Sequence, residues 1–263
     1  MGTEADSLLG ALESSRYCTA LTGAGISTLS GIPDFRGPRP AFLFPEEVFS
    51  FDRFEGDPAF FYKTAGPFVY QLHKKEPSVV HRVLAGLEKR GPVRAVITQN
   101  IDMLHQKAGS ARVIELHGSP RFHYCLRCPG IRMGYGEAAE ALEAGRLPQC
   151  PRCGAVLKPA LTFYGEPLPL EARRQAEEEL YKTDLLLVLG TGLSVFPAAE
   201  LPRAALRRGG RIVIVNRQDT PLDGEAFLRF RELEGVFSPL ETMLRRRRDP
   251  RLRGDEWRTC GNV

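Results

Sequence analysis

Short apolar runs alternate along this chain with longer segments whose apolar residues recur at helical spacing. The apolar runs predict buried strands at residues 17–21, 93–98, 113–116, 184–189 and 211–215. The longer segments predict helices at residues 4–14, 77–90, 170–181 and 197–206. Strands that alternate with helices in this way are typical of an α/β fold with a parallel sheet.

One stretch departs from this alternation, because residues 48–73 are crowded with aromatic side chains. Asp57-Pro58 and Gly66-Pro67 divide the stretch into short helices, since proline and glycine interrupt helical backbone. We interpret it as a small helical subdomain with an aromatic core. The chain is long enough for one large domain that carries such an insert.

Glycines directly follow two of the predicted strands. Gly23-Ala24-Gly25 ends the first strand, and glycines there let the backbone turn sharply with N–H groups free to face an anion. Gly190-Thr191-Gly192 lies ahead of another predicted helix and suits a phosphate or ribose contact. The match to the common dinucleotide fingerprint is incomplete, because Thr28 stands where a third glycine is usual. A pyrophosphate loop and a plain turn both stay open on this pattern alone.

Polar side chains lie at the carboxyl ends of other predicted strands, where ligands bind in open α/β sheets. Gln99-Asn100-Ile101-Asp102 follows residues 93–98, and Asn216 follows residues 211–215. Asp102 has two interpretations, a functional carboxylate or the N-cap of a short helix at 103–108.

His117 differs from the other histidines because it ends a core strand beside a glycine. Histidine exchanges protons near neutral pH, so this position is the candidate catalytic base. The remaining histidines lie inside predicted helices and strands, and we interpret them as structural. They are His73, His81, His105 and His123.

Two Cys-x-x-Cys pairs, Cys125/Cys128 and Cys150/Cys153, form the most specific motif in the chain. Each pair directs two thiolates at one metal, and two pairs complete a tetrahedral four-sulfur site. Four thiolates leave no open position for water, so we expect one structural zinc and not a catalytic metal. A redox dithiol is the alternative, which the occurrence of two pairs disfavours. A helix is predicted between the pairs at 137–144.

The net charge of +4 lies wholly in residues 245–263, which hold seven arginines and three acidic residues. The rest of the chain has 29 basic and 29 acidic groups, so the body is not a basic nucleic-acid binder. The tail is interpreted as a solvated chain end. There is no run of eighteen apolar residues and no secretory signal, so we expect a cytoplasmic protein without a membrane span.

A series of motifs occurs in the order typical of one known family. GAGIS and GIPDFRG occupy 23–27 and 31–37, TQNID runs into LHQKAG at 98–109, and ELHGS occupies 115–119. With the cysteine pairs, this series resembles the sirtuins of bacterial type, which are NAD-dependent protein deacylases, over roughly residues 8–244.

The resemblance implies a Rossmann-like domain formed by residues 1–38, 76–120 and 158–244. It also implies a smaller domain made of a helical module at 39–75 and a zinc module at 121–157, followed by a basic tail at 245–263. NAD would lie in the cleft between the two domains, and an acyl-lysine peptide would enter from the other side.

The resemblance also assigns roles to individual residues. The implied catalytic residues are His117 as general base, with Asn100 and Asp102 in the nicotinamide pocket. The implied NAD-binding residues are Gly23, Ala24, Gly25, Ser27, Asp34, Phe35, Arg36, Gln99, Asn100, Ile101, Asp102, Gly190, Thr191, Asn216 and Arg217. The implied peptide-binding residues are Phe163, Gly165, Glu166 and Val195.

The implied reaction consumes NAD as a co-substrate. The acyl oxygen attacks the ribose carbon as nicotinamide leaves, and His117 then activates a ribose hydroxyl for acyl transfer. Free lysine and O-acyl-ADP-ribose result. The substrate peptide would add a strand between two exposed edges, and we expect the enzyme to act as a monomer.

Some positions depart from the family pattern. Thr162 stands where valine is usual beside the acyl-lysine tunnel, and Gly192 replaces a serine of the second glycine loop. Phe42, Leu43 and Phe44 occupy the region where succinyl-removing sirtuins carry Tyr-x-x-Arg. This difference favours acetyl or longer aliphatic acyl groups.

Two other functions stay open on the sequence. The first is an ADP-ribosyltransferase, which would share the NAD site but transfer ADP-ribose to a protein. The second is a non-enzymatic module in which the zinc ribbon and the basic tail bind nucleic acid. The neutral body of the chain argues against the second.

Overall fold

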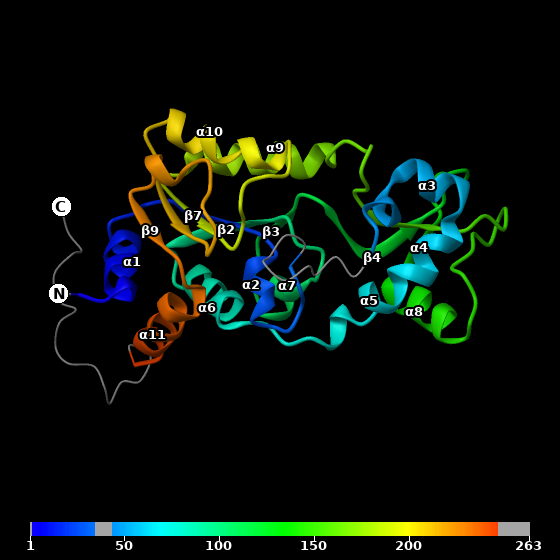
Figure 1. The fold of residues 1–263 in the computed structure, drawn as a ribbon, viewed down its shortest axis with the longest axis horizontal. Helices are drawn as coiled ribbons and strands as arrows, with labels where there is room; N and C mark the ends of the chain where they lie inside the picture. The colour runs from blue at the N-terminus through cyan, green and yellow to red at the C-terminus, as the bar shows by residue number, and fades with distance from the viewer. Residues whose placement is uncertain (1, 35–43, 247–263) are drawn as a thin grey trace.

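The structure, a computed structural model, describes residues 2–34 and 44–246. Within these residues the strands form two sheets, a six-stranded parallel sheet (the large sheet) and a three-stranded antiparallel sheet (the small sheet). Figure 1 shows helices on both sides of the large sheet and the small sheet with its own helices at the other end of the molecule. The predicted α/β class with a second, smaller unit is confirmed.

The large sheet has the strand order of a Rossmann fold. From one edge to the other its strands are β3 (Val113–Glu115), β2 (Val93–Thr98), β1 (Cys18–Thr22), β7 (Leu185–Leu189), β8 (Arg211–Val215) and β9 (Leu228–Phe230). The strand order reverses between β1 and β7, which pair in parallel. Ligands of such sheets bind in the crevice at this reversal, beyond the carboxyl ends of the strands.

Strands β1 and β7 lie at the centre of the large sheet because both of their faces are apolar. Every residue of both strands is buried. Central strands of a parallel sheet read as continuous apolar runs for this reason. The strands predicted from these runs agree with the structure to within one residue at each end, and β2 and β8 agree at both ends.

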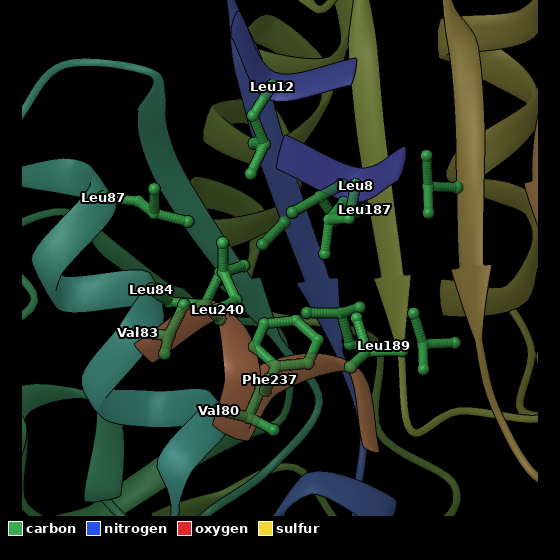
Figure 2. Packing of buried hydrophobic residues seen from close by; sticks show 14 of the residues in the cluster. Leu8, Leu12, Val80, Val83, Leu84, Leu87, Leu187, Leu189, Phe237 and Leu240 are labelled. Atoms are coloured by element: carbon green, nitrogen blue, oxygen red, sulfur yellow. The ribbon is translucent and has the colours of Figure 1, made fainter. Parts of the chain in front are cut away.

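Helices cover both faces of the large sheet. On one face α1 (Glu4–Glu13), α6 (Val79–Glu88) and α11 (Leu233–Arg246) interlock with β1 and β7 in one apolar cluster. Figure 2 shows Phe237 and Leu240 of α11 packed between Val80, Leu84 and Leu189. Each such buried side chain stabilises the fold by about 1.5–3 kcal/mol.

The opposite face is covered by α9 (Leu170–Lys182), η3 (Ala198–Glu200) and α10 (Pro202–Arg207). The helix predicted over 197–206 is therefore two short helices. Pro202 begins the second one, because proline fits the first turn of a helix but not its interior.

The last strand and the last helix of the described chain were not predicted. Strand β9 is three residues long and offers little periodicity. Helix α11 buries Val236, Phe237, Leu240 and Leu244, but Pro239 inside it and the arginines at its end hide the helical pattern. The helix runs to Arg246, two residues into the segment interpreted as tail.

The small sheet pairs strands from two distant parts of the chain. Its strands, in spatial order, are β5 (Arg132–Gly134), β4 (Gly118–Tyr124) and β6 (Lys158–Leu161). Strand β4 thus crosses the limit predicted at 120/121, whereas β6 begins directly after the limit predicted at 157/158. Helix α8 (Tyr135–Glu143) packs on the small sheet and confirms the helix predicted at 137–144, beginning two residues earlier and ending one residue earlier.

The aromatic stretch forms short helices that break where predicted. These are η1 (Glu46–Phe49), α3 (Phe51–Gly56), α4 (Pro58–Thr64), α5 (Gly66–Val69) and η2 (Leu72–Lys74). Asp57 caps α4 through a hydrogen bond from Phe60 N, and Pro58 is its first residue. Phe54, Phe61 and Tyr62 are buried in a common aromatic core.

Three more short helices occur in the connections, namely α2 (Gly25–Thr28), α7 (Leu104–Lys107) and η4 (Asp223–Glu225). The first two lie beyond the carboxyl ends of β1 and β2. None of the helices in the described ranges combines the length and the apolar character that a bilayer crossing requires.

Candidate active site

The two glycine loops meet where the strand order reverses. A β-carbon on Gly23 would lie 2.6 Å from Thr191 Cβ, and one on Gly25 would lie 2.8 Å from Gly190 Cα. Gly190 has a φ of +61°, and its own β-carbon would lie 2.5 Å from Ile26 N. The glycines are therefore required by the contact between the two loops, which leaves no room for side chains at these positions.

This contact changes part of the expected role of the glycine amides. Gly23 N donates to Leu189 O at 3.0 Å, and Gly25 N donates to Gly190 O at 2.8 Å. Because these N–H groups are already hydrogen-bonded within the protein, the expectation that they are free to face an anion is wrong for both positions.

Three side chains form a hydrogen-bonded network beyond the ends of β1 and β2. Asn100 Nδ2 donates to Gly23 O and to Ser27 Oγ, each at 3.1 Å. Ser27 Oγ donates in turn to Asp102 Oδ2 at 2.6 Å. All three side chains are buried, so the network is shielded from water and holds its geometry.

Asp102 makes the hydrogen bond of a helix cap without occupying the cap position, and its second carboxylate oxygen belongs to the network of Ser27. Its Oδ1 accepts a hydrogen bond from Leu104 N at 2.9 Å, which satisfies the first turn of α7. The adjacent Met103 has a φ of +62° and occupies the cap position itself, one residue later than predicted. Burial raises the pKa of Asp102, against the hydrogen bonds from Ser27 and Leu104, which lower it.

His117 follows β3 and lies beside this network. Its Nδ1 is 2.8 Å from Gln99 O, and since a carbonyl only accepts, Nδ1 carries the proton. In the neutral ring Nε2 is then the unprotonated nitrogen, as a general base requires. Burial lowers the pKa of His117, so the ring is neutral near pH 7.

The other buried histidines make structural contacts, as predicted. His81 and His105 have ring centroids 4.6 Å apart, and His105 Nε2 lies 3.0 Å from Thr22 Oγ1. His123 stacks on Tyr70 in the small domain and is hydrogen-bonded to its hydroxyl. The exposed His73 contacts Tyr135 at 3.0 Å.

Residues implied to bind the adenosine half lie directly after β7 and β8. Thr191 Oγ1 accepts a hydrogen bond from Gln99 Nε2 at 3.1 Å, which joins the two halves of the predicted NAD site. Asn216 Nδ2 donates to Gln218 O at 2.9 Å, and Arg217 forms an exposed ion pair with Glu232. Phe35 and Arg36 lie outside the described residues, as do Phe42 and Leu43.

The implied peptide-binding residues occupy two segments. Phe163 is buried, with its ring centroid 5.2 Å from that of Phe61, so its side chain belongs to the aromatic core. Gly165 has a φ of +96°, and Glu166 turns its carboxylate inward. In the second segment Val195 is half-buried beside Phe196, which is 70% exposed.

The four cysteines converge on one point in the small domain. Their sulfur atoms all lie within 4.8 Å of one another, and Cys125 Sγ is 3.6 Å from Cys153 Sγ. That separation is far beyond a disulfide bond, so the four thiols are free. Four convergent sulfur donors fit a tetrahedral zinc site.

Comparison with known proteins identifies the family. The model of the Sir2 family matches residues 23–197, which include both glycine loops, His117 and all four cysteines. The chain is 44% identical to an NAD-dependent protein deacetylase of Thermotoga maritima over 220 residues, covering 83% of this chain and 89% of the relative. This chain belongs to the Sir2 family.

Other sirtuins agree with this assignment. An NAD-dependent protein deacylase 2 of Archaeoglobus fulgidus is 43% identical, covering 81% of this chain and 84% of the relative. A solved structure described as Sir2 with a p53 peptide and NAD+ has a TM-score of 0.83 and 41% identity, covering 91% of this chain and 96% of that one. A sirtuin bound to a propionylated peptide has a TM-score of 0.82 and 40% identity, covering 91% and 97%.

The sequence analysis did not single out one buried charged residue that contacts a residue implied to bind the peptide. Lys158 was noted only as the point where the chain returns from the zinc module, yet its side chain is fully buried and 2.8 Å from Glu166. The one sequence signal for this burial is that the lysine begins an apolar strand close to aromatic residues, where its side chain has little access to solvent.

Proposed function

We propose that this sirtuin is an NAD-dependent protein-lysine deacylase, with acetyl-lysine as its principal substrate. The reaction would convert acyl-lysine, NAD and water into free lysine, nicotinamide and O-acyl-ADP-ribose. The observation that carries the proposal is the fixed tautomer of His117, whose Nδ1 proton is held by Gln99 O next to the buried network of Asn100, Ser27 and Asp102.

The residues present fit NAD. The two glycine loops meet at the point of the sheet where dinucleotides bind, and a buried amide and carboxylate lie immediately beyond it. Gln99, Thr191, Asn216 and Arg217 would contact the ribose and adenosine parts, and Asn100, Ile101 and Asp102 would surround the nicotinamide. Bound NAD supplies the ribose carbon that accepts the acyl oxygen when nicotinamide leaves.

His117 would act as the general base of acyl transfer. Gln99 O holds the ring in one orientation, and Nε2 can take the proton of a ribose hydroxyl. Because burial lowers the pKa of His117, the base is unprotonated at neutral pH without an acidic partner to activate it.

Asn100 and Asp102 would hold the carboxamide of nicotinamide. Ser27 connects them, because its hydroxyl accepts from Asn100 Nδ2 and donates to Asp102 Oδ2. Such a network orients both side chains before the substrate arrives, so little reorganisation is needed on binding.

The acyl-lysine peptide would bind beside the segment that contains Gly165 and Glu166. This segment connects to the proposed base through its backbone, since Thr162 N donates to His117 O at 2.9 Å. A peptide positioned on the segment would therefore bring its acyl group close to His117. The zinc would have no part in the chemistry and would hold the small domain together. We further propose that the enzyme acts as a monomer and does not use nucleic acid as a ligand.

The test is an analysis of products. Purified protein is incubated with an acetyl-lysine peptide and NAD, and the products are separated and weighed by mass spectrometry. We expect free lysine peptide and O-acetyl-ADP-ribose in equal amounts, with one nicotinamide each. ADP-ribosylated protein with the acetyl group retained would instead support an ADP-ribosyltransferase, and no NAD-dependent product would contradict the proposal.

A further inference from the structure

Lys158 is a lysine with no exposure to solvent in the small domain. Lysine is almost never fully buried unless its charge is paired, because removing an ammonium from water is costly. Lys158 opens strand β6 and lies five residues after the last cysteine of the zinc site. Its burial therefore calls for a partner that fixes the ammonium at this place.

The ammonium of Lys158 is surrounded by groups that suit a cation. Nζ lies 2.8 Å from Glu166 Oε2 and donates to Leu161 O at 2.6 Å. The ring of Phe163 lies 4.2 Å from Nζ, close enough for a cation–π contact. Burial lowers the pKa of Lys158 and the carboxylate of Glu166 raises it, so the pair keeps the charge in place.

The same carboxylate closes a turn in the backbone. Glu166 Oε2 accepts a hydrogen bond from Phe163 N at 2.8 Å, and Glu166 N donates to Phe163 O at 3.0 Å. Gly165 supplies the φ of +96° that this turn needs, which side chains rarely permit. One carboxylate oxygen thus joins the buried ammonium to the main chain of 163–166.

The residues on either side are held by neighbouring elements. Thr162 N donates to His117 O at 2.9 Å, and Tyr164 N donates to Phe49 O at 2.7 Å. Phe51 N donates back to Tyr164 O at 3.0 Å. The turn at 163–166 therefore lies between the proposed base and the helical module, and the ammonium of Lys158 lies under it.

We propose that Lys158 is a positioning residue for the acyl-lysine polypeptide substrate. Its ammonium holds Glu166, and Glu166 holds the turn whose edge receives the substrate backbone. The inference rests on the proposed deacylase function and adds a residue that touches neither substrate nor NAD. Without the ammonium, the Glu166 carboxylate has no buried partner and turns outward to water, which releases Phe163 N and loosens the turn.

The experiment compares the full-length protein with Lys158→Met, Glu166→Gln and the double variant. A fluorescein-labelled acetyl-lysine peptide reports the dissociation constant by anisotropy, and kinetics report KM for peptide and for NAD. We expect each single variant to weaken peptide binding and raise peptide KM by about 10- to 100-fold, since small misplacements carry such costs. KM for NAD should change by less than about threefold, because the NAD contacts lie on the large sheet.

The double variant gives the most discriminating comparison. If Lys158 acts through Glu166, the double variant binds peptide no more weakly than Lys158→Met, because the second change removes a contact already lost. Lys182→Met is the matched control, since Lys182 also faces a glutamate, at 3.4 Å, but lies on α9 in the large domain. It should leave peptide affinity unchanged.

Two results would overturn the inference. One is Lys158→Met with wild-type peptide affinity, and the other is additive losses in the double variant. Zinc content and melting temperature are measured for every variant, and if Lys158→Met does not fold, Lys158→Gln replaces it in the same comparison. A wild-type protein that neither binds nor deacylates the peptide would instead count against the proposed function.

Discussion

The two walls of the proposed site are held by different forces. On the large sheet, Asn100, Ser27 and Asp102 lie beyond the carboxyl ends of β1 and β2 and are joined by hydrogen bonds of 2.6–3.1 Å. On the small domain, Phe163, Glu166 and Lys158 are held by packed rings and a buried ion pair. The first wall positions the groups proposed to react, and the second positions a segment of backbone.

This difference predicts how each wall responds to change. A parallel sheet that is buried on both faces tolerates loss of one polar side chain at its edge, because the strands beneath it are held by apolar packing. The small domain has few strands and a small core, so it depends on its metal and on its aromatic cluster. Substitutions in the first wall should abolish activity and leave the fold intact. Substitutions in the second wall should reduce activity and also destabilise the small domain.

Loss of the zinc should have the largest effect. Cys128→Ser removes one of four thiolates, and structural zinc sites contribute apparent binding free energies of about 10–16 kcal/mol. We expect the variant to lose zinc, to become protease-sensitive within 121–157 and to lose deacylation. Metal analysis of the wild type should give one zinc per chain.

The control for this change is Cys18→Ala. Cys18 is buried in β1, away from the cysteine cluster, so the variant should retain zinc and activity at a modest cost in stability. Active wild-type protein with less than about half an equivalent of zinc, or a stable and active Cys128→Ser, would show that the metal is not structural.

The two walls also differ in how far the sequence predicts them. Residues of the first wall follow directly after apolar runs, and strand ends of a parallel sheet share one edge, so Asn100, Asp102 and His117 could be grouped before the structure was known. Their hydrogen-bond partners could not be predicted, because the hydrogen bond between Ser27 and Asp102 joins residues that are 75 apart in sequence.

The second wall is predicted only in outline. The cysteine spacing indicates the zinc site, and the prolines mark the helix breaks, since both signals are local. The inward turn of Glu166 and the burial of Lys158 depend on how β4, β6 and the aromatic helices pack. The short strands of the small sheet and helix α11 with its internal Pro239 likewise gain their stability from tertiary contacts, which local patterns do not encode.

Replacing His117 should have the next largest effect. His117→Ala removes the proposed base, and loss of general base catalysis lowers rates by about 10²–10⁴. The fold and zinc content should be unchanged, because the ring lies at a strand end and not in the core. Deacylation is measured by release of free lysine peptide, together with melting temperature and zinc content.

Exchange of labelled nicotinamide into NAD separates the steps. His117→Ala should retain exchange if the base acts after nicotinamide leaves, while Asn100→Ala should lose it. His73→Ala is the control, since the His73 side chain is exposed and contacts Tyr135 in the small domain. Near-normal deacylation by His117→Ala would refute the assignment of the base.

Acid should destabilise the large domain through its buried histidines. Burial lowers the pKa of His81 to about 3, with a smaller contribution from Arg82. Below about pH 6.5 the unfolded chain binds a proton that the folded chain does not, so stability is lost as pH falls from about 6.5 toward 3. The loss per histidine is at most about 1.4 kcal/mol for each pH unit.

Urea unfolding at about pH 7 and about pH 5.5 measures this slope, in a range where most carboxylates are still ionised. His81→Gln should reduce the slope, because glutamine cannot take up the proton. Burial also lowers the pKa of His105, so part of the dependence of stability on pH should remain in the variant. Equal slopes in wild type and variant would contradict the role of His81.

The choice of acyl group should follow from charge at the small-domain wall. Phe44 packs on Phe68 at 5.7 Å, and Thr162 is half-buried, so neither offers a cation to a buried carboxylate. The ammonium of Lys158 is already paired with Glu166. We expect kcat/KM for acetyl-lysine to exceed that for succinyl-lysine by at least about tenfold, because an unpaired buried charge is costly. Equal or faster desuccinylation would disprove this.

The smallest expected effect concerns two exposed arginines, which lie near the carboxyl ends of β8 and β9. Arg217 pairs with Glu232 at 2.9 Å and Arg231 pairs with Asp219 at 2.9 Å, but only Arg217 is assigned to NAD. Surface ion pairs contribute about 0–1 kcal/mol, so Arg217→Gln and Arg231→Gln should both unfold nearly as the wild type does. KM for NAD should rise roughly two- to tenfold in Arg217→Gln, since a lost hydrogen bond costs about 0.5–1.5 kcal/mol. It should stay constant in Arg231→Gln, and equal KM values in the two variants would remove Arg217 from the NAD site.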